Sequence, residues 1–215
     1  VCQSNDMKND FIENLGFKRE KLVVINNPVT SSFSLKIQQP DQSILKFVTI
    51  GRLVPQKGHL RILKALKDFN KPFLYTIIGD GKEKEKIMNF ATKNRLQSKI
   101  KHISFTSEVD KYLADSHLFL SGSYVEGFPN VFLESCAVGT PVLAFKAPGG
   151  INEIIIDGIN GYAVDSLADF KDRLVNFEVD KWNLEKVRES VTSRYSEKII
   201  LQRYEKLFIE VAKKN

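Results

Sequence analysis

The sequence predicts an α/β protein with a doubly wound, Rossmann-like parallel sheet of about six strands and helices on both faces. Two observations support this fold class. Short runs rich in β-branched and aromatic residues alternate with longer stretches whose apolar residues recur at helical spacing. The short runs are apolar throughout, as expected for strands that are buried on both faces of a parallel sheet. Strands separated by helices in this way form βαβ units.

Each element follows from its own residues. The predicted strands are Lys46–Ile50, Phe73–Ile78, Ile100–Phe105, His117–Ser121, Val142–Phe145 and Gly161–Val164. The predicted helices are Leu60–Phe69, Lys82–Arg95, Glu108–Ala114, Asn130–Val138, Leu167–Phe177, Leu184–Val191 and Glu197–Ala212, with a short helix or turn at Glu153–Ile156. Ligands of such sheets bind outside the carboxyl ends of the strands. We therefore expect the loops that follow the first five strands to surround one site.

The first 40 residues fit this pattern less well. Val1–Ser4 resembles the end of a strand, Ser4 is a suitable cap for a helix that reaches Leu15, and Leu22–Ile25 is a predicted strand. We expect residues 1–40 to be the tail of a preceding domain and an interdomain linker. Residues 41–196 would form the Rossmann-like domain and 197–215 a closing helix, in a chain that is a fragment of a protein roughly twice as long.

Composition excludes several classes of protein. The 215 residues carry 32 basic and 26 acidic side chains, with 42% hydrophobic and 27% charged residues, which is ordinary for a globular chain. The longest apolar runs are about five residues, whereas a membrane-spanning helix needs about 20. Two cysteines do not make a disulfide framework, so a cytoplasmic setting is expected. The basic stretches lack interleaved aromatic residues, so no nucleic-acid partner is predicted.

The loop after the first strand carries two cations. Gly51 would allow a sharp turn, and Arg52 and Lys57 bracket the loop before a helix begins. A helix start also favours negative charge. Two fixed positive charges at this place suit a diphosphate. The alternative interpretation is that both are solvated loop cations.

The loop after the fourth strand carries two carboxylates, Glu126 and Glu134, with a helix that begins between them. Gly127 permits close backbone approach, and the free amides near Asn130 and Val131 would face an anion. Two acids cannot both bind a diphosphate favourably, so their partners should be hydroxyl groups. Sugars supply such groups, a ribose on one side and a transferred hexose on the other.

A third loop, Ala147–Glu153, contains the pair Gly149-Gly150. These residues form a tight turn or let the backbone touch a ligand.

These three motifs together resemble the family-4 (group 1) retaining glycosyltransferases. Gly51-Arg52 with Lys57-Gly58, then Glu126 and Glu134 with seven residues between them, then Gly149-Gly150 with Glu153, occur in the family's order. The resemblance covers about residues 26–161 and points to the C-terminal, nucleotide-sugar-binding domain of a two-domain GT-B enzyme. The closing helix would cross back toward a missing N-terminal domain.

The resemblance implies a role for each site residue. Arg52, Lys57 and Glu126 would be the catalytic residues: the two cations would neutralise the diphosphate, and Glu126 would contact hydroxyls of the donor sugar. Glu134 would contact the ribose. The remaining donor-binding residues would be Gly51, Thr106, Val109, Gly127, Phe128, Asn130 and Val131.

The resemblance also implies what the protein binds. The donor would be a nucleotide sugar, most commonly a UDP-sugar, with no metal and no other cofactor. The missing domain would bind the acceptor, a glycan or a lipid-linked sugar. A cytoplasmic enzyme of this kind, with peripheral contact at the inner face of a membrane, fits a role in polysaccharide or lipopolysaccharide synthesis.

Two other functions remain open from the sequence. A non-catalytic module could hold a nucleotide or phosphosugar on the same fold. A sugar-nucleotide epimerase could also use it, without any acceptor. The pair Glu126 and Glu134 favours a sugar-handling site over a module that needs only phosphate.

Overall fold

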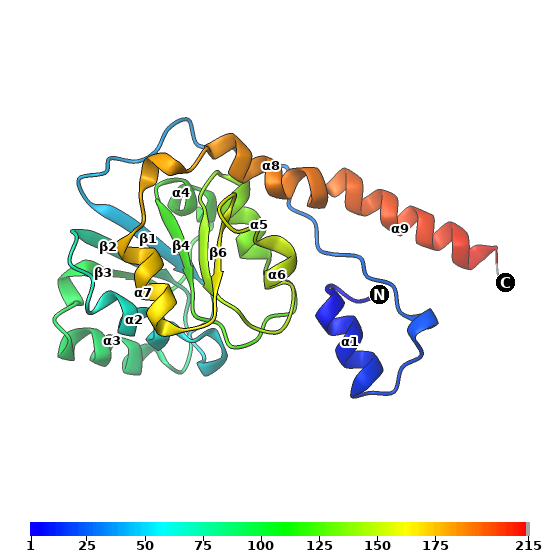
Figure 1. The fold of residues 1–215 in the computed structure, drawn as a ribbon, viewed down its shortest axis with the longest axis horizontal. Helices are drawn as coiled ribbons and strands as arrows, with labels where there is room; N and C mark the ends of the chain where they lie inside the picture. Colours follow the sequence, from blue (N-terminus) through cyan, green and yellow to red (C-terminus); the bar gives the residue numbers. More distant parts are fainter. Residues whose placement is uncertain (214–215) are drawn as a thin grey trace.

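In the computed structural model, which describes residues 1–213, six parallel strands form one sheet in the order β3-β2-β1-β4-β5-β6 (Figure 1). The strands are β1 Leu45–Ile50, β2 Phe73–Ile78, β3 Ile100–Ile103, β4 Leu118–Ser121, β5 Val142–Phe145 and β6 Gly161–Val164. The strand order reverses between β1 and β4, which is the position where doubly wound sheets bind ligands. The predicted fold class is confirmed.

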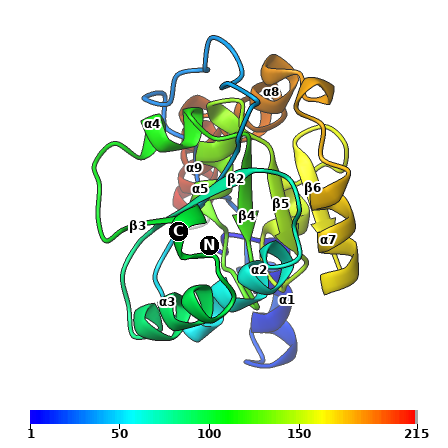
Figure 2. The same ribbon diagram turned by 90° about the vertical axis from the view of Figure 1, so that its left-hand side faces the viewer.

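Helices cover both faces of the sheet (Figures 1 and 2). One face carries α2 (His59–Leu66), α3 (Lys84–Lys93) and α7 (Leu167–Val175); the other carries α4 (Val109–Ala114), α5 (Asn130–Ala137), α6 (Ile151–Ile154) and α8 (Leu184–Tyr195). A separate hydrophobic core fills each interface. Phe145 and Phe170 stack with ring centroids 4.5 Å apart in the first core, and Phe119 meets Phe132 edge to face in the second.

Several element boundaries differ from the prediction. The third strand ends at Ile103 and not at Phe105, because its only partner in the sheet, β2, ends at the register pair Ile78–Ile103. The helix predicted over Leu60–Phe69 runs from His59 to Leu66. The helix predicted to stop at Val191 continues to Tyr195, and the next helix begins two residues later.

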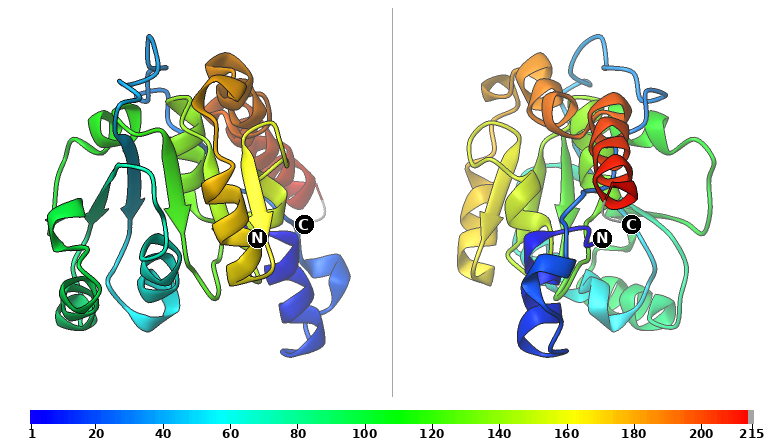
Figure 3. Two further views of the ribbon diagram at one scale, coloured as in Figure 1. Left: turned by 60° about the vertical axis from the view of Figure 1, so that its left-hand side comes forward. Right: turned by 90° about the vertical axis from the view of Figure 1, so that its right-hand side faces the viewer.

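The N-terminal segment contains one helix, α1 (Asn5–Glu13), whose Ser4 hydroxyl accepts a hydrogen bond from Met7 N at 3.2 Å. The predicted cap is therefore confirmed. The predicted strand Leu22–Ile25 is wrong: Val24 forms a single parallel bridge with Cys2, and the described chain offers no neighbouring strand that would extend it. Figure 3 shows this segment beside the main body, near one edge of the sheet.

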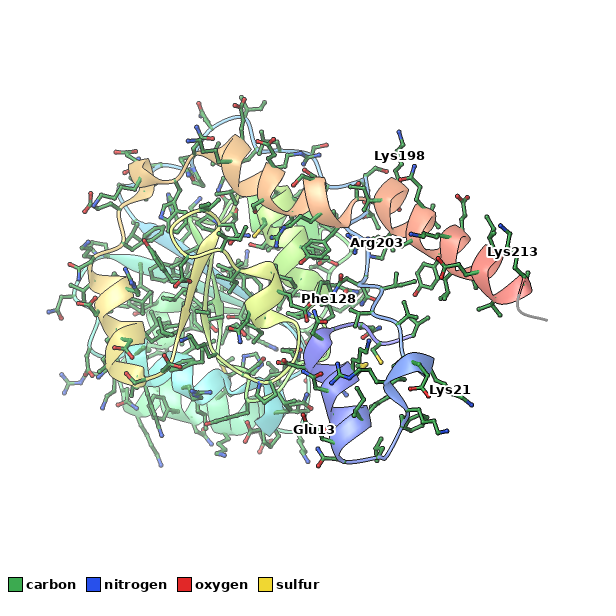
Figure 4. The ribbon with its side chains drawn as sticks, turned by 45° about the vertical axis from the view of Figure 1, so that its right-hand side comes forward. Glu13, Lys21, Phe128, Lys198, Arg203 and Lys213 are labelled. Atoms are coloured by element: carbon green, nitrogen blue, oxygen red, sulfur yellow. The ribbon has the colours of Figure 1, made fainter. Side chains whose placement is uncertain are left out.

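The last helix, α9 (Glu197–Ala212), extends away from the sheet (Figure 1). Ile200 is buried where the helix starts, while Leu201 and Phe208 are 61% and 65% exposed. Arg203 lies over the linker, and its Nη1 is 3.4 Å from Asn26 Oδ1 (Figure 4). Within residues 1–213, no helix combines the length and the apolar character needed to cross a bilayer.

Candidate functional site

Loops from β1, β4 and β5 meet at the carboxyl edge of the sheet because glycines let their backbones touch. Gly58 has φ +59°, and a Cβ there would lie 1.9 Å from the carbonyl oxygen of Gly122. Gly149 has φ +114°, and its Cβ would lie 1.8 Å from the carbonyl oxygen of Glu126. No side chain fits at either contact. Gly51 differs from the expectation, because its φ is ordinary and a Cβ would meet nothing closer than Lys57 at 3.9 Å.

A salt bridge lies where these loops meet. Lys57 Nζ is 2.6 Å from Glu126 Oε1 and 2.8 Å from Oε2. The Ser123 hydroxyl donates a third hydrogen bond to Glu126 Oε1 at 2.6 Å. The side chains of Lys57 and Glu126 are 22% and 9% exposed, so solvent screens the pair only in part. The carboxylate is thus fixed in place before any ligand binds.

Arg52 lies in a different environment from Lys57. Its side chain is exposed and forms no ion pair within residues 1–213. Its backbone oxygen lies 3.1 Å from Nε2 of the buried His59. The two cations predicted to act together therefore sit in one loop, one neutralised by Glu126 and the other open to solvent.

The first turn of α5 provides backbone N–H groups. The first turn of a helix leaves its amides without intrahelical partners, and here Phe132 N donates back to Pro129 O at 3.0 Å. The amides of Asn130 and Val131 form no hydrogen bond within the described residues, so they can bind an anion.

Glu134 is half-buried on α5, and its carboxylate forms no hydrogen bond or ion pair within residues 1–213. Burial raises the pKa of its carboxyl group, because a charged carboxylate is disfavoured away from water. The two carboxylates of the motif therefore differ: Glu126 has three hydrogen-bond contacts, and Glu134 has none.

Phe128 contributes packing and not a polar contact. Its ring is buried, lies 5.4 Å from the ring of Tyr195, and would collide with a Cβ on Gly150 (Figure 4). Gly127 lies beside α1, where an added Cβ would be 3.7 Å from Met7 Cε. The backbone oxygen of Gly127 accepts a hydrogen bond from Gly150 N at 2.9 Å.

Thr106 and Val109 follow β3, which is separated from β1 by β2. Thr106 Oγ1 accepts a hydrogen bond from Glu108 N at 3.0 Å, and Val109 begins α4. Between β3 and this turn, Phe105 is 85% exposed. These residues share the carboxyl edge with the salt bridge but make no hydrogen bond to it.

The third loop binds the N-terminal segment. Gly149 N donates to Asp6 Oδ2 at 2.9 Å. Glu153 accepts hydrogen bonds from Asn5 N (2.6 Å), Asn5 Nδ2 (3.0 Å) and Asn26 Nδ2 (3.2 Å). The motif residue Glu153 therefore connects α1 and the segment around Asn26 to the sheet. A cavity of about 370 Å³ lies between α1 and the loop that carries Glu126.

The sequence interpretation missed two residues of this site. Ser123 holds Glu126, and its position three residues earlier in the same loop was the available signal. His59 follows Gly58 directly and lines a cavity of about 10 Å³ with Lys57 and Glu126. Its Nδ1 is buried without a partner, and burial lowers its pKa, so the ring is neutral near pH 7.

Comparison with protein families now identifies the chain. Residues 33–193 match the family model described as glycosyl transferases group 1. The chain belongs to this family. The group 1 part of the predicted resemblance is therefore confirmed, and the matched region contains all three loops of the site.

Curated relatives of this group 1 glycosyltransferase chain come from bacteria and an archaeon. An uncharacterized glycosyltransferase from Methanocaldococcus jannaschii is 37% identical over 163 residues, which covers 75% of this chain and 43% of the relative. The lipopolysaccharide core biosynthesis glycosyltransferase LpsE of Rhizobium meliloti is 28% identical, over 72% of this chain and 46% of the relative. The amylovoran biosynthesis glycosyltransferase AmsD of Erwinia amylovora is 30% identical, covering 68% and 48%. The chain spans somewhat less than half the length of these relatives.

Solved structures of GT-B glycosyltransferases share the fold. The lipopolysaccharide outer core galactosyltransferase WaaB, in its apo form, superposes with a TM-score of 0.84 at 21% identity, over 97% of this chain and 61% of that one. Anabaena HepE in complex with UDP superposes with a TM-score of 0.82 at 19% identity, over 97% of this chain and 63% of that one. The sheet and its flanking helices thus have the fold of the matched parts of these GT-B structures.

Proposed function

We propose that this chain is the donor-binding half of a retaining glycosyltransferase that takes its sugar from a nucleotide sugar, a UDP-sugar. The observation that carries the proposal is the Lys57–Glu126 pair, fixed beside the free amides at the start of α5. A cation and a helix N-terminus can bind a diphosphate, and a held carboxylate can bind sugar hydroxyls.

The proposed chemistry follows from these positions. As the bond between the anomeric carbon and the diphosphate breaks, negative charge grows on the leaving oxygen. Arg52, Lys57 and the α5 amides would stabilise that charge, and the sugar would pass through an oxocarbenium-like transition state. Glu126 would orient the donor sugar through its hydroxyls, and Glu134 would accept hydrogen bonds from the ribose. The nucleotide base would lie near Thr106 and Val109.

Donor binding would change the partners of Lys57. Glu126 takes both short contacts of the Lys57 ammonium group. A diphosphate would compete for Lys57, while Ser123 keeps one oxygen of Glu126 in place. The carboxylate would then have a free oxygen for a sugar hydroxyl, so phosphate binding would prepare the sugar site.

The donor assignment is supported by likeness. HepE is described with UDP and with UDP-glucose, and the pneumococcal O-GlcNAc transferase GtfA with UDP and GlcNAc. Since two side-chain cations and backbone amides can neutralise a diphosphate, we propose that no metal is required. The acceptor, a glycan or lipid-linked sugar, would bind to residues outside this chain, and membrane contact would belong to the full-length enzyme.

Isothermal titration calorimetry with UDP, GDP and ADP tests the proposal, each run with and without EDTA and at two salt concentrations. We expect UDP to bind best, EDTA to have no effect, and affinity to fall with salt because the cations are partly exposed. A matched pair of variants, Lys57→Ala and the exposed Lys64→Ala on α2, separates a site cation from general charge. Equal losses for both variants, or a strict need for Mg²⁺, would contradict the proposal.

A further inference from the structure

The two largest cavities described lie at the opposite edge of the sheet from the donor loops. Each has a volume of about 580 Å³, within the range typical of ligand sites. They adjoin, because Gly158 and Lys181 line both. Tyr162 is the second residue of β6, so these cavities open at the amino ends of the strands. In Figure 1 the segment between α7 and α8, which forms one wall, lies at the top of the molecule, far from α1.

An aromatic cluster shapes the second of these cavities, which we call the α7–α8 groove (Tyr162, Arg173, Asn176, Phe177, Glu178 and Trp182). The Tyr162 and Trp182 rings meet edge to face at 5.6 Å, and the Phe177 ring lies 6.3 Å from Trp182. The guanidinium of Arg173 covers the Tyr162 ring at 3.9 Å. These contacts occupy the aromatic faces, which argues against a ligand that would bind by stacking a base.

The polar groups of the groove remain available. Arg173 forms no hydrogen bond or ion pair within residues 1–213, although stacking on Tyr162 fixes its plane. The Tyr162 hydroxyl lies near Gly158, 3.8 Å from where a Cβ would be, and the described residues offer it no hydrogen-bond partner. Asn176 uses Nδ2 to bind Asp172 at 2.9 Å, which leaves its Oδ1 as an acceptor.

These groups define the chemistry of a ligand. A guanidinium with a fixed plane and unused donors suits a carboxylate, which it can bind through two parallel hydrogen bonds. A hydroxyl and an amide oxygen beside it suit the hydroxyls of a sugar ring. Arg173 and Lys181 are positive, whereas Glu178 alone is negative and is already paired with Lys181 at 2.8 Å. The groove therefore favours an acidic, hydroxyl-rich ligand.

We propose that the α7–α8 groove binds a hexuronate unit of a glycan, at a second saccharide site separate from the donor site. The choice of a glycan over an acidic peptide rests on the proposed function, since an enzyme that extends glycans meets them at high local concentration. A bound chain at this edge would keep the glycan on the protein between transfers.

The single tryptophan of the chain, Trp182, lines the groove and reports on it directly. We expect trigalacturonate to change the emission of Trp182 saturably, with a dissociation constant on the order of 1 mM. Maltotriose, which has no carboxylate, and a glutamate tripeptide, which has no sugar ring, should give no saturable change. Binding of either probe as tight as that of trigalacturonate would overturn the proposal, as would no response to trigalacturonate.

Variants on α7 provide the matched test. Arg173→Ala should weaken trigalacturonate binding by about tenfold or more, the loss expected for charge-assisted hydrogen bonds, and Arg173→Lys by less. Lys171→Ala removes the same charge from the same helix, but Lys171 pairs with Asp68 and does not line the groove, so binding should not change. If both alanine variants weaken trigalacturonate binding equally, the ligand is attracted by charge alone, and the proposed site is overturned.

UDP separates this inference from the proposed function. Saturating UDP should leave the affinity for trigalacturonate unchanged, because the two sites lie at opposite edges of the sheet. Displacement of trigalacturonate by UDP would overturn the second site. If calorimetry detects UDP binding but Trp182 does not respond to trigalacturonate, the inference fails alone. If Trp182 responds but UDP does not bind, the proposed donor function fails instead.

Discussion

Two lysines at opposite edges of the sheet are both shielded from water, but they have different partners. At the carboxyl edge, Lys57 Nζ touches both oxygens of Glu126. At the amino edge, Lys36 Nζ donates to the backbone oxygen of Ser116 at 2.9 Å and to the Thr140 hydroxyl at 3.0 Å. No carboxylate contacts Lys36 in the described chain, and burial lowers its pKa to about 8.

The difference separates a lysine with a charged partner from one that contacts only neutral acceptors. Burial disfavours the ammonium form of Lys36 and lowers its pKa, and the charge of Asp115 offsets this only in part. It fastens the linker to the starts of β4 and β5 through neutral acceptors. Lys57 has the carboxylate of Glu126 beside it, which in the proposed function would bind a sugar hydroxyl once a phosphate binds Lys57.

The largest expected effect comes from moving the loop that carries Lys57. Gly58→Ala places a Cβ 1.9 Å from the Gly122 carbonyl oxygen and forces a side chain into a left-handed φ. We expect a loss of about 3–4 kcal/mol in the free energy of unfolding, measured by urea titration, together with weaker UDP binding.

Gly51→Ala is the matched control in the same loop, because its Cβ would meet only the Lys57 side chain at 3.9 Å. Its free energy of unfolding should stay within about 1 kcal/mol of the parent value. A large loss of unfolding free energy for Gly51→Ala, or no loss for Gly58→Ala, would show that the contact between the backbones of Gly58 and Gly122 does not determine the conformation of the loop.

Lys36 should make stability depend on pH above 8. Its pKa in the folded chain, about 8, lies below the ordinary value of 10.5. Between these values the unfolded chain holds a proton that the folded chain has released, so the free energy of unfolding rises with pH, by on the order of 2–3 kcal/mol. Urea titrations at pH 7.5 and 10.5 on the parent and on Lys36→Met measure this rise as a difference between the two proteins.

The exposed Lys64→Met provides the comparison for that experiment, since it removes a lysine without touching the linker. In Lys64→Met the free energy of unfolding should rise with pH as it does in the parent, and in Lys36→Met this rise should be absent. An identical pH dependence in all three proteins would mean that Lys36 titrates normally in the folded chain.

Removing the countercharge of Lys57 should have a smaller effect. Glu126→Gln leaves an ammonium group that is 22% exposed without its carboxylate, and we expect a loss of about 1–2 kcal/mol, below the value for a fully buried pair. A double-mutant cycle with Lys57→Met in urea isolates the coupling energy between the two side chains.

Glu126→Ala tests the sugar role of the same residue. It should reduce the preference for UDP-sugar over UDP while changing the affinity for UDP little. Equal losses of affinity for both ligands would contradict the sugar role.

Glu134 should give the smallest change in stability, with the opposite sign. Burial raises its pKa, so its protonated form stabilises the folded chain at low pH and this contribution is lost as pH rises through the folded value. Glu134→Gln should therefore be slightly more stable than the parent at pH 7, and the gain should vanish below the ordinary value of 4.5. Thermal unfolding at pH 4 and 7 measures this.

The same substitutions test the ribose role of Glu134. Glu134→Ala should weaken UDP binding more than Glu134→Gln, because glutamine keeps one acceptor. Parent-like affinity in both variants would assign Glu134 to the fold alone.

The sequence predicted the fold class and the succession of strands and helices, for a physical reason. A buried parallel strand and an amphipathic helix each leave a periodic pattern within about ten residues, so these elements follow from local signals. The cap at Ser4 is equally local. The boundary errors arose where a partner ends, as at Ile103, because pairing and not propensity stops that strand.

The contacts that define the site could not be predicted in this way. Lys57 and Glu126 are 69 residues apart, and Asp6 and Gly149 are 143 apart, so their meeting depends on the packing of whole elements. The α7–α8 groove was missed for the same reason. Tyr162, Arg173 and Trp182 each fit a core or surface pattern, and only the fold places them around one cavity.

The position of β1 in the middle of the sheet has a consequence for how the chain acquires its structure. Its partner on one side, β2, follows closely along the chain, but its partner on the other side, β4, follows much later. Lys46 in β1 and His117 just before β4 are hydrogen-bonded and are 71 residues apart. Folding is slowed because the entropy of closing this long loop is lost before the contacts between the two strands can stabilise it. During synthesis, β1 would thus wait with an unpaired apolar edge, which makes this the step most exposed to aggregation.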